Sequence, residues 1–128
     1  MEARKRAYTP YSGYRVGAAL RTAGGRIYQG CNIENASYGA TNCAERTAFF
    51  KAVSEGEKEF AAIAIVGGAG ERQDTFPDMA YPCGICRQVM REFCGPEFRI
   101  LVGRSAEDYE EYTLEELLPK SFGRERSV

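Results

Sequence analysis

The sequence of 128 residues contains no histidine. This absence excludes catalytic Ser–His and Cys–His pairs and every metal site with a histidine ligand. A bound metal must therefore be held by Cys, Asp or Glu, and a general base must be a carboxylate, Lys, Tyr or Cys.

Long hydrophobic segments and a charge surplus are missing as well. The longest apolar run, residues 60–66, is too short to cross a bilayer, and no apolar segment follows the basic residues near the N-terminus. The 17 Lys and Arg residues nearly balance the 18 Asp and Glu residues, which argues against binding to nucleic-acid phosphates. We therefore expect a cytoplasmic protein without membrane or nucleic-acid partners, in which the five cysteines stay reduced.

Predicted strands and helices alternate along the chain, which we expect to form one domain over residues 1–128. We expect strands over residues 14–21, 26–31, 60–66 and 98–102, helices over residues 1–8, 43–54, 83–94 and 114–118, and loops over residues 32–41 and 67–80. Asn42 is the expected cap of the second helix, and Thr113 with Glu116 forms a capping box for the last. This alternation predicts an α/β sandwich.

Three cysteines stand at the expected starts of two helices. Cys83 and Cys86 are three residues apart, so both sulfurs lie on one face of their helix, where backbone N–H groups favour thiolates. Cys43 stands at the start of the other helix, and parallel packing of the two helices would bring three thiolates to one point. Zinc takes four tetrahedral ligands, so three protein ligands leave one position for water. Glu45, in the same first turn as Cys43, is near enough to take a proton from that water.

Other interpretations of the cysteines are open at this point. A CxxC pair alone is also typical of a thiol–disulfide oxidoreductase or of two buried thiols. A structural zinc site with four sulfur ligands, as in an interaction module, requires Cys31 or Cys94 as the fourth ligand. Cys94 lies at the far end of the same helix as Cys86, and Cys31 at the end of a strand is more typical of packing.

Two arginines each lie one residue from a key position of the site, Arg46 after Glu45 and Arg87 after Cys86. Three thiolates around Zn²⁺ would leave one net negative charge, which weakens the acidifying effect of the metal. Arg46 and Arg87 could offset this charge by donating hydrogen bonds to sulfur, so we expect loss of Arg46 to lower the rate or the zinc content.

The combined motifs resemble those of the cytidine deaminases of the small, homotetrameric kind. The resemblance covers nearly the whole chain and rests on residues 11–12, 16–20, 30–38, 43–46, 82–88, 117–119 and 122. It implies a three-layer α/β/α sandwich around a five-stranded mixed sheet, with one Zn²⁺ per subunit held by Cys43, Cys83 and Cys86. It also implies that Glu45 shuttles the proton in the hydrolytic deamination of cytidine and 2′-deoxycytidine, in pyrimidine salvage.

The resemblance also assigns residues to the substrate. Asn32 and Glu34 are expected to hold the ribose hydroxyls, since residues two apart on an extended segment point to one side. The backbone of Ala44 is expected to contact the pyrimidine. Tyr14 stands where the family usually has Phe, packed near the nucleoside, and its added hydroxyl needs a partner if it is buried.

Partners follow from the same resemblance. Residues that match Ala36, Tyr38 and Phe122 reach into a neighbouring subunit's site in this family, which implies a homotetramer with shared sites. The charge balance offers no basic surface for flanking nucleotides, which favours a free nucleoside over a polynucleotide as substrate. A deaminase of similar fold acting on another aminopyrimidine nucleoside, such as blasticidin S, is the nearest alternative among enzymes.

Overall fold

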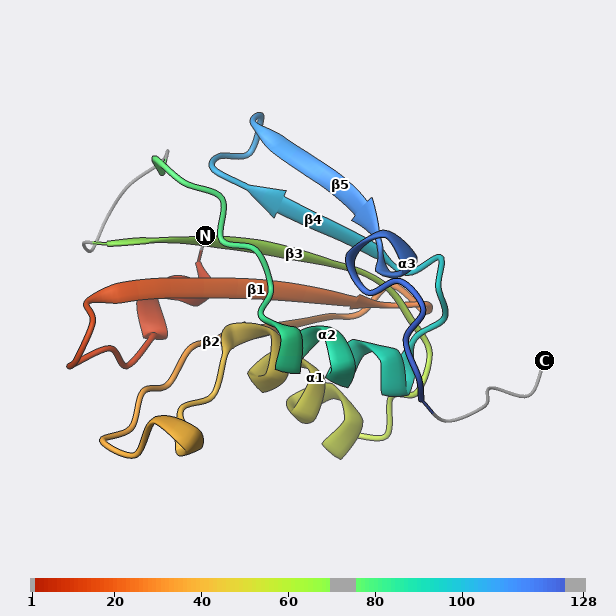
Figure 1. The fold of residues 1–128 in the computed structure, drawn as a ribbon, viewed down its shortest axis with the longest axis horizontal. Helices are drawn as coiled ribbons and strands as arrows, with labels where there is room; N and C mark the ends of the chain where they lie inside the picture. Colours follow the sequence, from red (N-terminus) through yellow and green to blue (C-terminus); the bar gives the residue numbers. More distant parts are fainter. Residues whose placement is uncertain (1, 70–75, 124–128) are drawn as a thin grey trace.

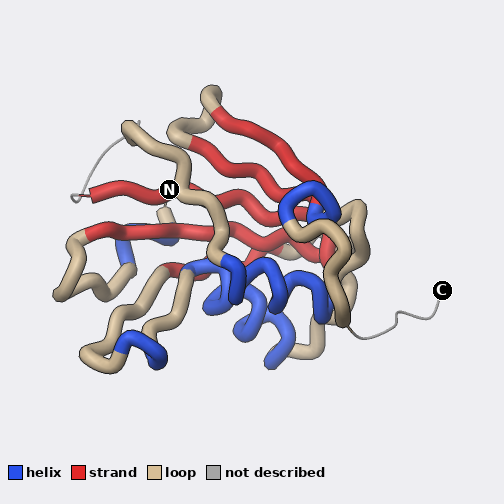
Figure 2. The backbone as a smooth tube through the Cα atoms, viewed as in Figure 1, coloured by secondary structure: helices blue, strands red, loops and turns tan. Residues whose placement is uncertain are grey.

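The structure is a computed structural model that describes residues 2–69 and 76–123. Its centre is a five-stranded sheet in the order β2-β1-β3-β4-β5 (Figures 1 and 2). The strands are β1 (Tyr14–Thr22), β2 (Ile27–Cys31), β3 (Phe60–Ala69), β4 (Arg99–Gly103) and β5 (Tyr109–Thr113). The helices are α1 (Ala44–Ser54), α2 (Gly84–Phe93) and α3 (Leu114–Leu117), with 3₁₀ helices η1 (Ala3–Arg6) and η2 (Tyr38–Ala40). None of these helices has the length and apolar character needed to span a membrane.

Strand direction explains where the two longer helices begin. β1 pairs antiparallel with both β2 and β3, and β3 pairs parallel with β4, so β2, β3 and β4 run in one direction. α1 connects β2 to β3, and α2 connects β3 to β4. A helix that returns the chain between strands of one direction begins at the carboxyl edge of those strands. Both helices therefore start at the same edge of the sheet and lie side by side (Figure 1).

α1 and α2 cover one face of the sheet and form the core with it. Phe49 of α1 is fully buried, and its ring centroid lies 6.1 Å from that of Phe93 in α2 and 5.1 Å from that of Phe60 in β3. Gly30 of β2 allows a close approach of α1, because a Cβ on Gly30 would lie 2.3 Å from the carbonyl oxygen of Ala44. These contacts fix the two helix starts relative to the sheet and to each other.

The opposite face of the sheet carries η1. Neighbouring residues of a strand face opposite sides of the sheet, so Gly17 faces away from the core that contains Ala18. A Cβ on Gly17 would lie 2.6 Å from the backbone nitrogen of Arg4 in η1. The buried guanidinium of Arg4 donates to the carbonyl oxygen of Gly68 at 2.7 Å and lies 4.6 Å from the ring centroid of Phe76. The predicted α/β fold with a five-stranded mixed sheet is thus confirmed, and η1 supplies a short helical layer on this second face.

Some local predictions are confirmed and others are wrong. The capping box of Thr113 and Glu116 is present at α3. β3 runs to Ala69, past the predicted end at 66, because its last residues pair with the start of β1. Cys43 rather than Asn42 is the N-cap of α1, and the Asn42 amide donates instead to the hydroxyl of Thr47 at 3.0 Å. β5 has no apolar alternation in its sequence, and pairing with β4 defines it.

Candidate active site

Cys43, Cys83 and Cys86 meet where α1 and α2 begin. Cys43 is the N-cap of α1, Cys83 is the N-cap of α2, and Cys86 lies in the first turn of α2. The Sγ atom of Cys83 lies 3.7 Å from that of Cys43 and 3.4 Å from that of Cys86, and all three sulfurs are within 4.8 Å of one another. The expected convergence of the three sulfurs is therefore present in the fold.

The separations of the three sulfurs fit a tetrahedral zinc ion. Ligand atoms about 2.3 Å from a tetrahedral zinc lie about 3.8 Å apart, and the two sulfur pairs above are 3.7 and 3.4 Å apart. Cys31 and Cys94 lie outside this cluster, since Cys94 is buried in the core and Cys31 ends β2. Only three of the five cysteines can thus bind one ion, which disfavours a structural site with four sulfur ligands.

Arg46 stabilises the anionic form of the cluster. Its Nη2 atom donates to Sγ of Cys43 and to the carbonyl oxygen of Thr41, both at 3.3 Å. A hydrogen bond from Cys86, with a further one from Arg46, lowers the pKa of Cys43 to about 5. The hydrogen bond to Cys43 and burial raise the pKa of Cys86. Of Cys43 and Cys86, Cys43 therefore loses its proton first as the pH rises.

Glu45 is the buried carboxyl group of the site. It is the second residue of α1, and the residue is 4 % exposed. Burial raises the pKa of Glu45 to about 7, and the negative charge of Cys43 adds to the rise. A carboxyl group with a pKa near neutrality can both accept and release a proton at physiological pH.

A cavity of about 340 Å³ opens beside the sulfurs and Glu45. Its volume falls in the range of small-molecule sites. Six of the residues expected in the site line it: Tyr14, Asn32, Cys43, Ala44, Glu45 and Cys83. The hydroxyl of Tyr14 makes no hydrogen bond within residues 2–69 and 76–123, and burial raises its pKa.

A further wall of the cavity comes from the segment before α2. Met79, Ala80 and Tyr81 line it, although no sequence pattern identifies them as site residues. Their position directly before Pro82 and Cys83 is the one sequence signal that points to them.

Asn32 lines the cavity with part of its hydrogen-bonding capacity already used. Its Oδ1 accepts from the backbone N–H of Val16, and its Nδ2 donates to the carbonyl oxygen of Tyr14, both at 2.9 Å. A side-chain amide has two N–H donors, so one remains for a ligand. Asn32 therefore anchors the start of β1 and still presents a donor to the cavity.

Glu34 lies in an adjoining cavity of about 300 Å³, and Thr41 lines both cavities. The Glu34 carboxylate accepts from the backbone N–H groups of Tyr11 and Ser12 at 3.0 and 3.1 Å and from the Ser12 hydroxyl. These bonds, the hydroxyl bond foremost, lower the pKa of Glu34 and keep it ionised. Asn32 and Glu34, which were expected to hold the same ribose, therefore line two cavities that share Thr41.

The three residues expected to serve a neighbouring subunit lie at the surface. Ala36 is exposed, Tyr38 is 86 % exposed and Phe122 is 81 % exposed. Tyr38 lines the cavity that contains Glu34, and the carbonyl oxygen of Phe122 accepts from Nε2 of Gln88 at 3.1 Å. These side chains are accessible to another molecule.

Arg87 donates to carbonyl groups rather than to a sulfur. Its Nε bonds the carbonyl oxygen of Pro82 and its Nη1 that of Leu117, both at 2.8 Å. This geometry corrects the expectation of a direct bond from Arg87 to a thiolate. Arg87 instead joins the start of α2 to the end of α3.

Comparisons with known proteins agree on one family. The family model for the "Cytidine and deoxycytidylate deaminase zinc-binding region" matches residues 1–102. A cytidine deaminase from Sporosarcina psychrophila is 50 % identical over 97 % of this chain and 86 % of its own length. One from Halalkalibacterium halodurans is 50 % identical over 98 % of this chain and 89 % of its own length. The fold is similar to a crystal structure of cytidine deaminase from Burkholderia pseudomallei, with a TM-score of 0.84 and 46 % identity, over 94 % of this chain and 91 % of that one.

Proposed function

The chain belongs to the cytidine and deoxycytidylate deaminase family, and on that basis we propose that it converts free cytidine and 2′-deoxycytidine to the uridines. The observation that carries this proposal is the meeting of three sulfurs and a buried carboxyl group at one cavity. We place the reaction in pyrimidine salvage and in the cytoplasm, where a reducing environment keeps the thiols free to bind metal.

Cys43, Cys83 and Cys86 would hold one Zn²⁺ per chain. When bound, Zn²⁺ lowers the pKa of water and so supplies a nucleophile near neutral pH. Arg46 donates to Cys43 and offsets part of the charge of the three thiolates.

Glu45 moves the protons of the reaction. It takes a proton from the attacking water, delivers it to N3 of the ring and then helps to protonate the amine on C4. Water supplies the new oxygen at C4 and the amine leaves as ammonia, so the atoms balance. Attack at C4 creates a tetrahedral carbon, and a hydrated-pyrimidine mimic is therefore expected to bind far more tightly than the substrate.

The other cavity residues bind and orient the nucleoside. Asn32 donates its remaining N–H, and Glu34 accepts, at the ribose hydroxyls. Ala44 is the first residue of α1, so its backbone N–H has no helical partner and can bond the pyrimidine. Tyr14 packs its ring against the nucleoside.

We further propose a homotetramer in which Ala36, Tyr38 and Phe122 complete a neighbouring subunit's site. The exposure of Tyr38 and Phe122 supports this arrangement, because aromatic side chains are enriched at contact surfaces between proteins. Sedimentation of the purified protein tests it: a monomer at working concentration would contradict shared sites.

Ammonia release from cytidine, measured with and without a zinc chelator, tests the proposed reaction. The Glu45→Gln variant should keep its zinc and lose about 10²–10⁴-fold in turnover. Glu55→Gln, at the C-cap of the same helix, is the matched control. Turnover of Glu45→Gln near that of the unaltered protein refutes the role of Glu45. Faster deamination of blasticidin S than of cytidine refutes the substrate assignment.

A further inference from the structure

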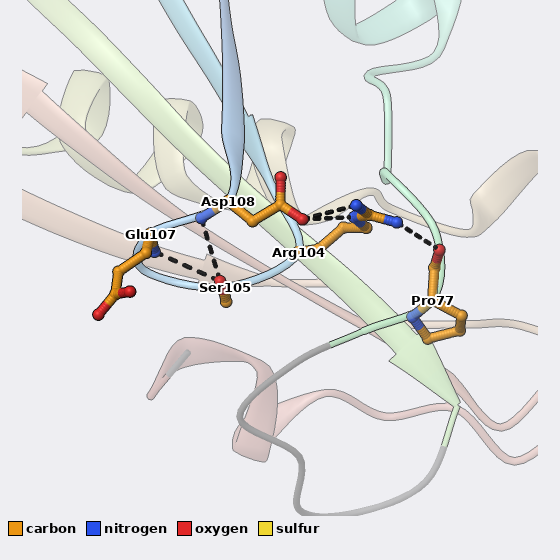
Figure 3. Close-up of polar contacts among 5 residues, drawn as sticks. All are labelled: Pro77, Arg104, Ser105, Glu107 and Asp108. Atoms are coloured by element: carbon orange, nitrogen blue, oxygen red, sulfur yellow. Dashed lines mark hydrogen bonds and ion pairs between the residues drawn. The ribbon is translucent and has the colours of Figure 1, made fainter.

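The turn between β4 and β5 holds the start of the segment that becomes a cavity wall. The Arg104 guanidinium donates to the Asp108 carboxylate at 3.0 and 2.6 Å and to the carbonyl oxygen of Pro77 at 3.3 Å (Figure 3). The backbone N–H of Phe76 donates to the carbonyl oxygen of Arg104 at 2.9 Å. Within the turn, the Ser105 hydroxyl oxygen accepts two backbone N–H groups at 3.3 and 3.1 Å. A rigid turn therefore anchors residues 76–77.

A second attachment lies further along the same segment. One carboxylate oxygen of Glu110, in β5, accepts from the hydroxyls of Tyr81 and Tyr112, each at 2.6 Å. The two rings contact each other edge to face, with centroids 6.3 Å apart. Hydrogen bonds to a carboxylate are shorter and stronger than those between neutral groups, so these two phenols are firmly held. Tyr81 lines the cavity that contains Glu45.

Tyr81 needs this attachment, because its own surroundings hold it weakly. The residue is 48 % exposed, so packing alone leaves the ring free to adopt other rotamers. It stands two residues before Cys83, and a change in its position would alter the cavity wall beside the metal ligands. The carboxylate of Glu110 is the group that selects one orientation.

We propose that Glu110 is a positioning residue for substrate binding, which acts through Tyr81 to fix the wall of the cavity against which the nucleoside rests. This inference rests on the proposed function, because it assigns the nucleoside to that cavity. Glu110 itself does not line the cavity that contains Glu45, so it acts without touching the substrate.

Steady-state kinetics on cytidine test the proposal with three variants of the full chain. For Glu110→Ala we expect KM to rise by about tenfold with kcat changed less than about twofold, the pattern of lost ground-state binding. Glu110→Gln retains an oxygen that can accept both phenols, so KM should return to within about twofold of the unaltered protein. The control is Glu111→Ala, because Glu111 is adjacent in β5 but pairs with Arg99 on β4 at 2.7 Å.

A second measurement does not depend on the substrate. Hydrogen exchange of the backbone amides of residues 79–81 should become faster in Glu110→Ala and stay unchanged in Glu111→Ala. Tyr81→Phe removes the same hydrogen bond from its other end. It should raise KM as Glu110→Ala does, with no further rise in the double variant.

The outcomes separate the two proposals. Equal KM in Glu110→Ala and Glu111→Ala overturns the positioning role, whatever the exchange rates show. If the unaltered protein releases no ammonia from cytidine, the proposed function fails instead. In that case the exchange rates decide only whether Glu110 holds the wall of the cavity in place: unchanged exchange in Glu110→Ala overturns that attachment, and faster exchange confined to that variant supports the attachment without a role toward the nucleoside.

Discussion

Replacing Arg46 by methionine removes one hydrogen bond from the metal site while keeping most of the side-chain stem. Nη2 of Arg46 donates to the Cys43 sulfur at 3.3 Å. A hydrogen bond to a charged group contributes about 1.5–3 kcal/mol, and loss of a partner that bonds a metal ligand costs about 10–100-fold in metal affinity. We therefore expect Arg46→Met to weaken zinc binding by about 10–100-fold, which corresponds to about 1.4–2.7 kcal/mol.

The same substitution should change the free energy of unfolding of the metal-free protein much less than it changes the free energy of zinc binding. Cys43 can take up a proton when Arg46 is absent, whereas a metal-bound thiolate cannot. In addition, Nε of Arg46 is buried without a hydrogen-bond partner among residues 2–69 and 76–123. Burying such a group costs about 1–3 kcal/mol, and the variant removes that cost, which offsets the lost hydrogen bond from Nη2 of Arg46 to the carbonyl oxygen of Thr41. We expect the free energy of unfolding of the metal-free protein to change by less than about 1 kcal/mol.

Competition with a chelator of known affinity measures the zinc affinity of each variant. Denaturant unfolding of the metal-free protein measures its free energy of unfolding. Lys51→Met is the matched control, because Lys51 lies on the same helix and donates to the carbonyl oxygen of Gln29 at 2.6 Å, away from the sulfurs. Its zinc affinity should match that of the unaltered protein. A loss smaller than about threefold in Arg46→Met, or an equal loss in Lys51→Met, would refute the reasoning.

Three further predictions concern the contacts that place the site, and thermal or denaturant unfolding measures each. Gly30→Ala should destabilise the fold by about 1–3 kcal/mol, because the new Cβ would lie 2.3 Å from the carbonyl oxygen of Ala44; unchanged stability contradicts the close approach of β2 and α1. Phe49→Ala should cost about 3–5 kcal/mol, because the ring is fully buried between aromatic neighbours; a loss under about 1 kcal/mol contradicts its central place. Arg4→Met should cost about 1–3 kcal/mol by leaving the carbonyl oxygen of Gly68 without this donor, and a stabilised variant contradicts that account.

Local patterns in the sequence predicted the elements that carry the metal ligands. Cys83 and Cys86 share a helix turn because their spacing of three residues is a property of any α-helix. Glu45 lies in the first turn of α1, two residues after the N-cap Cys43, because the helix begins at Ala44. Such patterns did not predict strand β5, because its sequence has no apolar alternation and its place depends on pairing with β4.

Side-chain partners were harder to predict than elements. Arg46 follows Glu45 and Arg87 follows Cys86 in the sequence, yet only Arg46 donates to a sulfur. Asn32 has the chemistry of a ribose ligand, and the fold also uses its amide to hold the backbone of β1. A side chain takes the partners that its surroundings offer, and those surroundings include segments far away in the chain.

The amino-acid sequence by itself determined the chemistry that is available to this protein. With no histidine, a metal site must come from thiolates and carboxylates, and the short spacings between them follow from helix geometry. Tertiary structure alone decided how those groups meet. The parallel direction of β2, β3 and β4 brings two helix starts to one edge, and the segment held by the β4–β5 hairpin closes a cavity beside them. Local spacing acts within one turn of helix, whereas the distance between Cys43 and Cys83 depends on the packing of the whole sheet.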